Sequence, residues 1–109
     1  MWIITKIGFF SIVQKPWNQP DDSLTVRARA RTDLENLRAY LPDMSEIIAS
    51  EDSDYRYRAT ADRAVVMAAI SKLTADIDYD NFKNEVALRQ GYARAAIYGE
   101  VSEVLYKPI

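Results

Sequence analysis

Two short runs of arginine carry the residue types that bind anions. Val26 to Arg31 alternates small apolar residues with arginine, and Tyr55 to Arg58 alternates tyrosine with arginine. Side chains on a β-strand alternate between two faces, so each run would place its arginines on one face. A guanidinium group donates hydrogen bonds in a planar fork that matches carboxylate and phosphate oxygens. The runs therefore predict a surface for a partner that carries negative charge.

The partner of this surface is open at the level of sequence. The arginines could be ordinary surface residues paired with nearby carboxylates such as Glu51, Asp52 and Asp54. They could bind an acidic protein. They could also bind single-stranded nucleic acid, whose bases stack on aromatic side chains. In each partner-binding case the predicted residues are Arg27, Arg29, Arg31, Arg56, Arg58, Trp2 and Phe9.

The composition narrows the classes of function. The chain has no cysteine and no histidine, which excludes zinc sites built from those residues and Ser-His-Asp or Cys-His catalysis. The formal net charge is −2, so nucleic-acid binding would depend on a local basic patch. We therefore predict a non-catalytic binding protein without a cofactor, whose partner is another protein or a second copy of the chain.

A cluster of carboxylates supports a less favoured enzyme hypothesis. Asp76, Asp78 and Asp80 alternate along the chain and Glu85 follows, a set of oxygen ligands that suits Mg²⁺. A calcium loop is excluded, because Asn81 stands where such a loop needs glycine. Aspartates that cap a helix N-terminus explain the same residues without a metal, and we predict no metal site.

The first third of the chain predicts an antiparallel pair of strands. Residues 2–14 are rich in aromatic and β-branched residues and indicate one long strand with a bulge at Gly8. Residues 15–23 contain prolines and polar residues and predict a loop. Residues 24–31 return as the second strand. The side chains that it would turn toward the core are Leu24, Val26, Ala28 and Ala30.

The middle of the chain predicts a helix followed by two more strands. Thr32 and Glu35 form a capping box, and the helix after it would bury Leu34, Leu37 and Leu41. The two strands would span residues 46–50 and 55–59. In the second of them Tyr55 and Tyr57 would face the core and Arg56 and Arg58 would face outward.

Two helices complete the chain. Thr60 would cap a helix over residues 61–74, and Asp78 or Asp80 would cap a long helix that ends near Tyr106. Small residues recur four apart on the long helix, where they would let another helix approach closely. This helix-packing or dimer stripe comprises Ala87, Gly91, Ala95 and Gly99.

The order ββαββαα predicts an α+β fold. The simplest arrangement is a two-layer sandwich, with a four-stranded antiparallel sheet and helices on one face, ferredoxin-like in its layers. A length of 109 residues indicates that residues 1–109 form a single domain. No apolar run approaches the roughly 20 residues that cross a membrane, so we expect a soluble, cytoplasmic protein.

Three segments carry a resemblance to other proteins. These are the opening from Thr5 to Val13, the Asp54–Arg58 strand and the segment from Ile77 to Lys83. Together they resemble a group of small uncharacterised bacterial proteins, which implies no activity for this chain. The short, acidic composition is also similar to that of many phage-encoded inhibitors of host defence, which implies a role in blocking a host system.

Overall fold

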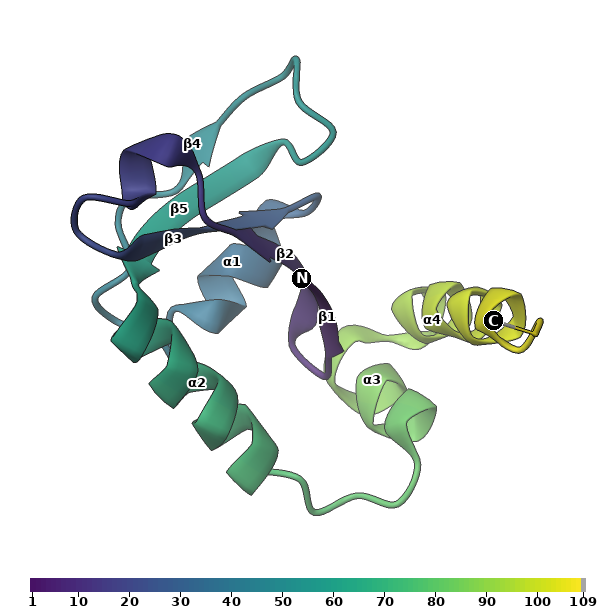
Figure 1. Cartoon of the computed structure of the whole chain (residues 1–109). Coiled ribbons are helices and arrows are strands. Elements are labelled where there is room, and N and C mark those ends of the chain that lie inside the picture. Colours follow the sequence, from purple (N-terminus) through teal and green to yellow (C-terminus); the bar gives the residue numbers. More distant parts are fainter. Residues whose placement is uncertain (109) are drawn as a thin grey trace. The chain divides into compact units, whose positions relative to one another are not determined.

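The computed structural model describes residues 1–108 (Figure 1). The strands are β1 (Trp2–Thr5), β2 (Gly8–Val13), β3 (Ser23–Ala28), β4 (Ile48–Ala49) and β5 (Tyr57–Asp62). The helices are η1 (Pro16–Asn18, a 3-10 helix), α1 (Arg31–Leu37), α2 (Arg63–Ala75), α3 (Phe82–Gln90) and α4 (Tyr92–Leu105). The chain forms two compact units, Met1–Ile77 and Asp78–Ile109. The single-domain organisation stays a prediction.

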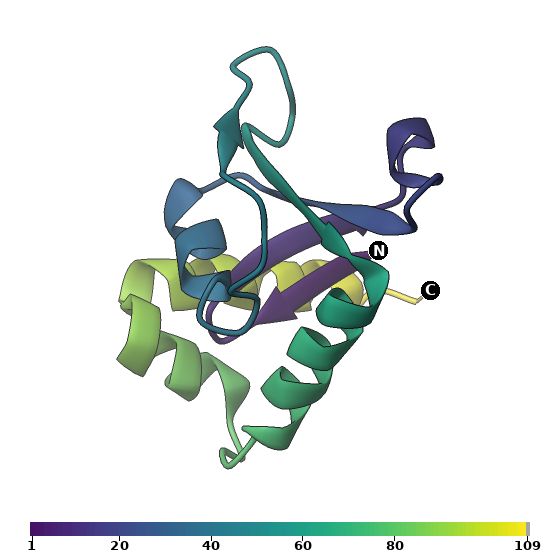
Figure 2. The same cartoon turned by 90° about the vertical axis from the view of Figure 1, so that its left-hand side faces the viewer.

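The first unit is an antiparallel sheet in the order β1-β2-β3-β5-β4. Helices α1 and α2 supply its second layer, on one face of the sheet (Figures 1 and 2). The α+β class is as predicted, and the number and order of strands are corrected to five in this arrangement. The short β4 pairs with β5 at the edge, so β5 lies directly beside β3.

The predicted long strand over residues 2–14 is a hairpin. Thr5 pairs with Gly8, and the turn between them contains only Lys6 and Ile7. The Thr5 hydroxyl accepts hydrogen bonds from the backbone N–H groups of Ile7 and Gly8, both at 3.2 Å. Gly8 therefore opens β2 and is not a bulge. The two residues between the strands include neither glycine nor proline, so the sequence carries no strong turn signal there.

The core lies between the inner face of the sheet and the helices α1 and α2. The predicted inward residues of β3 are buried: Val26 and Ala28 are fully covered and Leu24 nearly so. Helix α1 and the turn after it bury the predicted leucine stripe. The buried core comprises Phe10, Ile12, Leu24, Val26, Ala28, Leu34, Leu37, Leu41, Met44, Ala59, Ala61, Val66 and Ala69.

Helix α1 begins without the predicted capping box. The helix starts at Arg31, and Ala30 is its N-cap. Glu35 instead forms an ion pair with Arg31 at 3.3 Å. Asp33 is buried, and its carboxylate accepts a hydrogen bond of 3.1 Å from the Phe9 backbone N–H. This hydrogen bond ties the first turn of α1 to β2, and the helix begins one residue ahead of Thr32.

The boundary between β5 and α2 also differs from the prediction. Thr60 pairs with Thr25 inside the sheet, so it does not cap a helix. Strand β5 continues to Asp62, which is the N-cap of α2. The sheet pairing with β3 therefore extends β5 by three residues beyond the predicted end and delays the helix.

The second unit is a pair of helices where one was predicted. Helix α3 ends and α4 begins at Gly91, whose φ of +92° lies in the left-handed region that favours glycine. The N-cap of α3 is Asn81, whose side chain accepts a hydrogen bond from the Asn84 N–H at 3.0 Å. The expected cap at Asp78 or Asp80 is therefore wrong.

Candidate anion-binding surface

One row of residues crosses the outer face of the whole sheet. Strand pairing places Trp2 opposite Ser11, Ser11 opposite Arg27, Arg27 opposite Arg58, and Arg58 opposite Ile48. Directly paired residues share a face, so these five side chains form what we call the outer row. Four strand spacings of about 4.8 Å give the row a width of about 19 Å.

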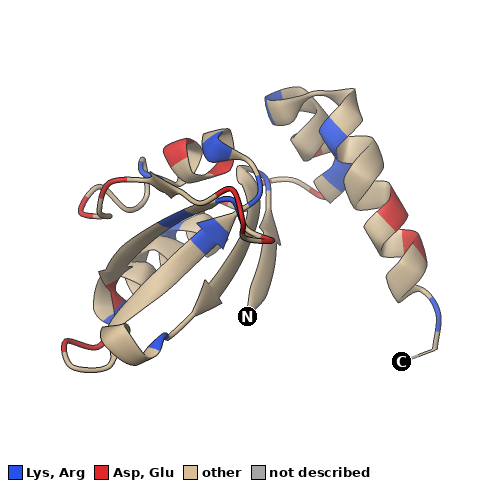
Figure 3. Ribbon diagram, turned by 90° about the horizontal axis from the view of Figure 1, so that it is seen from above, with Lys and Arg blue, Asp and Glu red and all other residues tan. Residues whose placement is uncertain are grey.

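Two arginines stand side by side at the centre of the outer row. Like charges directly opposite each other on paired strands are destabilising, yet Arg27 and Arg58 occupy such positions. Figure 3 shows basic residues on neighbouring strands of the sheet. Neither of the two arginines forms an ion pair with any carboxylate among the described residues, and the Nε atom of each is buried there without a hydrogen-bond partner. The pair therefore presents positive charge that the described chain leaves uncompensated.

Hydroxyl and carbonyl groups orient the two guanidinium groups. Arg27 Nη2 donates to the Ser11 hydroxyl at 2.7 Å. Arg58 Nη2 donates to the Ser53 hydroxyl at 2.5 Å and to the Tyr55 carbonyl at 3.3 Å. These neutral acceptors hold the side chains in place without neutralising them, so the two charges remain available to an anion.

An aromatic cluster lies beside the two arginines on the same face. The Tyr55 ring is 4.6 Å from the guanidinium carbon of Arg27 and 4.9 Å from that of Arg29. Its centroid lies 6.3 Å from the Phe9 ring, and Phe9 meets Trp2 edge to face at 6.1 Å. The prediction that Tyr55 faces the core is wrong, because it precedes β5 and packs on the outer face. Tyr57 packs against the core, as predicted.

The remaining predicted arginines differ in their surroundings. Arg29 is exposed beyond the end of β3, with its guanidinium carbon 5.9 Å from the Phe9 ring. Arg56 is exposed just before β5. Arg31 is not on a strand, because it opens α1 and pairs with Glu35. The contacts thus place three of the five predicted arginines on the outer face, Arg27, Arg29 and Arg58, and leave Arg56 exposed before β5.

Sequence reasoning missed Trp17 and Ile48 as parts of this face. The two side chains are 63% and 61% exposed, and both line an open groove of about 520 Å³ that also reaches Arg58. Ile48 can be placed on this face only when its pairing with Arg58 is known, and the sequence does not give that pairing. A tryptophan between two prolines in a polar loop was the available signal for Trp17.

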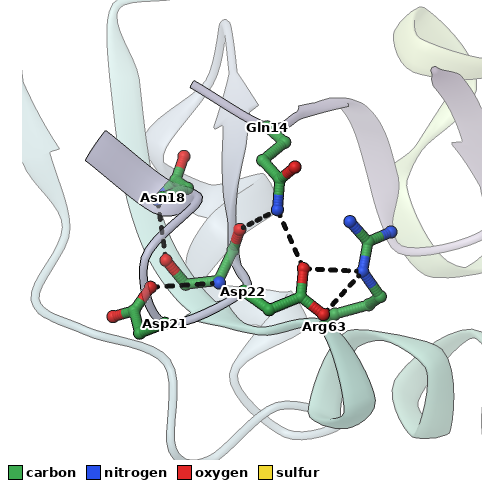
Figure 4. A network of polar contacts seen from close by, with 6 residues as sticks. Gln14, Asn18, Asp21, Asp22 and Arg63 are labelled. Atoms are coloured by element: carbon green, nitrogen blue, oxygen red, sulfur yellow. Dashed lines mark hydrogen bonds and ion pairs between the residues drawn. The ribbon is translucent and has the colours of Figure 1, made fainter. Parts of the chain in front are cut away.

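A buried asparagine fixes the loop that carries Trp17. Asn18 Nδ2 donates to the Ser23 hydroxyl at 2.8 Å (Figure 4). Asn18 Oδ1 accepts from the Thr25 hydroxyl at 2.7 Å and from the Lys15 N–H at 3.0 Å. The side chain is 2% exposed. Buried polar groups with all of these bonds hold a single conformation, so the backbone of the loop is fixed beside Trp17.

An ion pair ties the same loop to helix α2. Both carboxylate oxygens of Asp22 accept from Arg63 Nε, at 3.0 and 3.1 Å (Figure 4). The Gln14 amide also donates to Asp22, at 2.9 Å. The hydrogen bond from Arg63 and then that from Gln14 lower the pKa of the Asp22 carboxyl below its ordinary value. Asp22 adopts a positive φ of 51°, which makes the turn into β3.

Two of the four acidic residues of the magnesium hypothesis interact with other side chains of the chain. The Asp76 carboxylate accepts a hydrogen bond from the Tyr40 hydroxyl at 2.9 Å, and Glu85 pairs with Arg89 at 3.2 Å. Within residues 1–108 no three carboxylates come together as a metal site.

The predicted stripe of small residues is interrupted. Ala87 belongs to α3, Ala95 and Gly99 belong to α4, and Gly91 is the break between them. A side chain at Gly99 would approach Lys83 of α3, whose Cδ lies 3.7 Å from the place that a Cβ would occupy. The four residues therefore do not lie on one continuous helix, as the prediction assumed, and their role in helix packing or in a dimer stays a prediction.

Comparison of the chain with protein-family models, with curated proteins and with solved structures finds no match. In the part of the chain that the structure describes, no helix has both the length and the apolar character to cross a membrane.

Proposed function

We propose that this chain is a small cytoplasmic, non-catalytic binding protein that recognises an acidic region of another protein through the outer sheet face. The binding surface comprises the outer row together with Arg29, Arg56, Phe9 and Tyr55. A second copy of the chain is one such partner. Inhibition of a host system by masking an acidic surface is the role that the composition favours.

The observation that carries this proposal is the pairing of Arg27 with Arg58. Two cations placed directly opposite each other, without a carboxylate partner among the described residues, gain stability when an anion binds between or above them. Exposed apolar side chains, Trp2 at 72% and Ile48 at 61%, lie at the two ends of the same row. Aromatic residues and arginine are both enriched at protein interfaces, so a row that combines them suits a protein partner.

Single-stranded nucleic acid is the less favoured partner. Base stacking needs free aromatic faces, and the rings of Phe9 and Tyr55 are already packed against each other and against Arg27 and Arg29. Trp2 alone in this cluster offers an exposed ring. The overall net charge of −2 also disfavours a long polyanion.

The test reverses the two exposed arginines, Arg29→Glu with Arg56→Glu, which leaves the half-buried pair intact. Cells that produce the protein would be probed with the wild-type chain under cross-linking, and captured proteins and nucleic acids would both be identified. We expect an acidic protein whose affinity falls at least tenfold in the reversed variant. The matched control, Lys72→Glu with Arg31→Glu, makes the same charge change on the helical layer and should bind normally.

Two outcomes would replace this function. Equal binding by the reversed and control variants would show that the outer face is not the contact surface. A mobility shift of mixed single-stranded oligonucleotides at low salt, with a log–log salt slope of about −0.7 per phosphate, would assign the surface to nucleic acid. If the partner is a second copy, sedimentation should give a dimer for the wild type and a monomer for the reversed variant.

A further inference from the structure

A groove on the outer face continues from the centre of the outer row. The groove is open to solvent and has a volume of about 520 Å³. Its lining includes Trp17, Thr25, Glu46, Ile48, Arg58 and Thr60. Thr25 and Thr60 are directly paired on β3 and β5, so they form its floor on the outer face. The volume falls within the range of about 300–1,000 Å³ that is typical of ligand sites.

Trp17 and Ile48 give the groove an apolar lining that the described chain does not cover. Both side chains are more than half exposed. The Asn18 network fixes the loop beside Trp17, so little backbone freedom is lost when a partner packs against the indole. Tryptophan is enriched among the residues that dominate the binding energy of protein interfaces. The pair therefore favours an apolar side chain from a partner.

Arg58 adds a positive charge to the same groove. Its Nη2 and Nε atoms are held in place or buried, whereas Nη1 makes no hydrogen bond within residues 1–108. A carboxylate on Nη1 would form a charge-assisted hydrogen bond. Glu46 is exposed and lines the groove as well. The negative charge of Glu46 would repel a ligand with several acidic residues or phosphates, so the groove favours a ligand that places a single carboxylate on Arg58.

We propose that this groove receives an extended peptide segment of the acidic partner protein, with an apolar side chain against Trp17 and Ile48 and one carboxylate on Arg58. The inference rests on the proposed function, because it describes how part of that partner is recognised. The positive charge of Arg58 favours a carboxylate in the peptide, and the exposed apolar lining favours an apolar residue next to that carboxylate in the peptide sequence.

Selection from a library of random displayed peptides tests the inference with the full chain as bait. We expect enriched sequences that place an aspartate or glutamate next to an apolar residue. A synthetic peptide of the enriched sequence should shift the fluorescence of Trp17, read in a Trp2→Phe chain that has no other tryptophan. Its affinity should fall at least tenfold in Trp17→Ala and in Arg58→Gln. Met67→Ala, which removes an exposed apolar side chain from α2, is the matched control.

Several results would overturn the groove assignment. These are no enrichment over the uncoated support, enriched peptides without a carboxylate, or equal binding to the wild type and to Trp17→Ala and Arg58→Gln chains that are folded by circular dichroism. If these variants leave capture of the whole partner unchanged while Arg29→Glu with Arg56→Glu abolishes it, the groove inference is wrong and the proposed function stands. If instead the groove variants abolish capture and Arg29→Glu with Arg56→Glu leaves it unchanged, the groove inference stands and the proposed role of the exposed arginines is wrong.

Discussion

The Tyr55 ring lies over the guanidinium group of Arg27, with 4.6 Å between the ring centroid and the guanidinium carbon. The same ring is 4.9 Å from the guanidinium carbon of Arg29. Tyr55 is 7% exposed although it packs on the outer face of the sheet. One tyrosine from the segment before β5 thus positions two of the arginines of the proposed binding surface, through contacts that combine aromatic packing with cation–π attraction.

Replacement of Tyr55 should therefore affect both stability and binding. Tyr55→Ala removes a buried ring and should lower the free energy of unfolding by about 3 kcal/mol, in the range of large-to-small substitutions. Tyr55→Phe keeps the ring and should change it little. Denaturant unfolding measures both variants. A loss in Tyr55→Ala below about 1 kcal/mol would show that the ring is not packed as described.

The three glycines of the chain should respond differently to alanine. At Gly8 a Cβ would lie 2.6 Å from Asp33 Cγ, and Asp33 is held by the Phe9 N–H, so Gly8→Ala should cost about 1–3 kcal/mol. At Gly91 there is space, but φ is +92°, so Gly91→Ala should cost about 1–2 kcal/mol through backbone strain. Gly99→Ala should stabilise α4 by about 0.5–1 kcal/mol. Thermal unfolding of the three variants gives the order.

The ion pair of Asp22 predicts a dependence of stability on pH. Arg63 lowers the pKa of Asp22 in the folded chain, so the unfolded state binds more protons as the pH falls through the acidic range. The stabilisation is present above the ordinary carboxyl pKa of 3.8 and is lost as the pH falls through the lower pKa of the folded state. Asp22→Asn also tolerates the positive φ. The wild type should exceed Asp22→Asn in stability at neutral pH, and the difference should vanish in strong acid.

Asn18 should be sensitive to substitution because it serves three polar groups at once. Asn18→Ala leaves the buried hydroxyls of Ser23 and Thr25 without this partner, which should lower the free energy of unfolding by about 2 kcal/mol. Asn18→Asp keeps the acceptor but buries a negative charge at a position that is 2% exposed, so its loss at neutral pH should be at least as large. Fluorescence anisotropy of Trp17, read in the Trp2→Phe chain, should show faster motion in Asn18→Ala. Unchanged anisotropy would mean that the network does not hold the indole.

Local alternation made part of the outer face predictable. The parity of residues along β3 places Leu24, Val26 and Ala28 inward and Arg27 outward, and strand geometry preserves that parity wherever the strand begins. The same rule fails at Tyr55, because the extended segment starts two residues later and the ring meets Phe9 from a distant part of the chain. Contacts between segments far apart in sequence leave no periodic signal.

The breaks in secondary structure were harder to predict than the elements themselves. The turn after Thr5 is stabilised by the Thr5 hydroxyl and has no glycine or proline at Lys6 and Ile7, so residue type does not mark it as a turn. The break at Gly91 falls within a continuous run of helix-forming residues, and only its positive φ distinguishes it from an ordinary helical glycine. Both positions depend on backbone conformation, which residue type alone does not specify.

The pairing of Arg27 with Arg58 predicts a repulsive coupling that a double-mutant cycle can measure. Each single Arg→Gln variant loses its own hydrogen bonds but also relieves the repulsion, so the double variant should lose more stability than the two single variants together, by about 0.5 kcal/mol. Salt screens partly buried charges less than exposed ones, so the coupling of this half-buried pair should shrink but not vanish when the ionic strength rises from about 0.01 M to 1 M. Inorganic phosphate at matched ionic strength should stabilise the wild type more than the double variant. An attractive coupling, or one independent of salt, would show that the two cations do not oppose each other, and the case for an anionic partner would lose its main support.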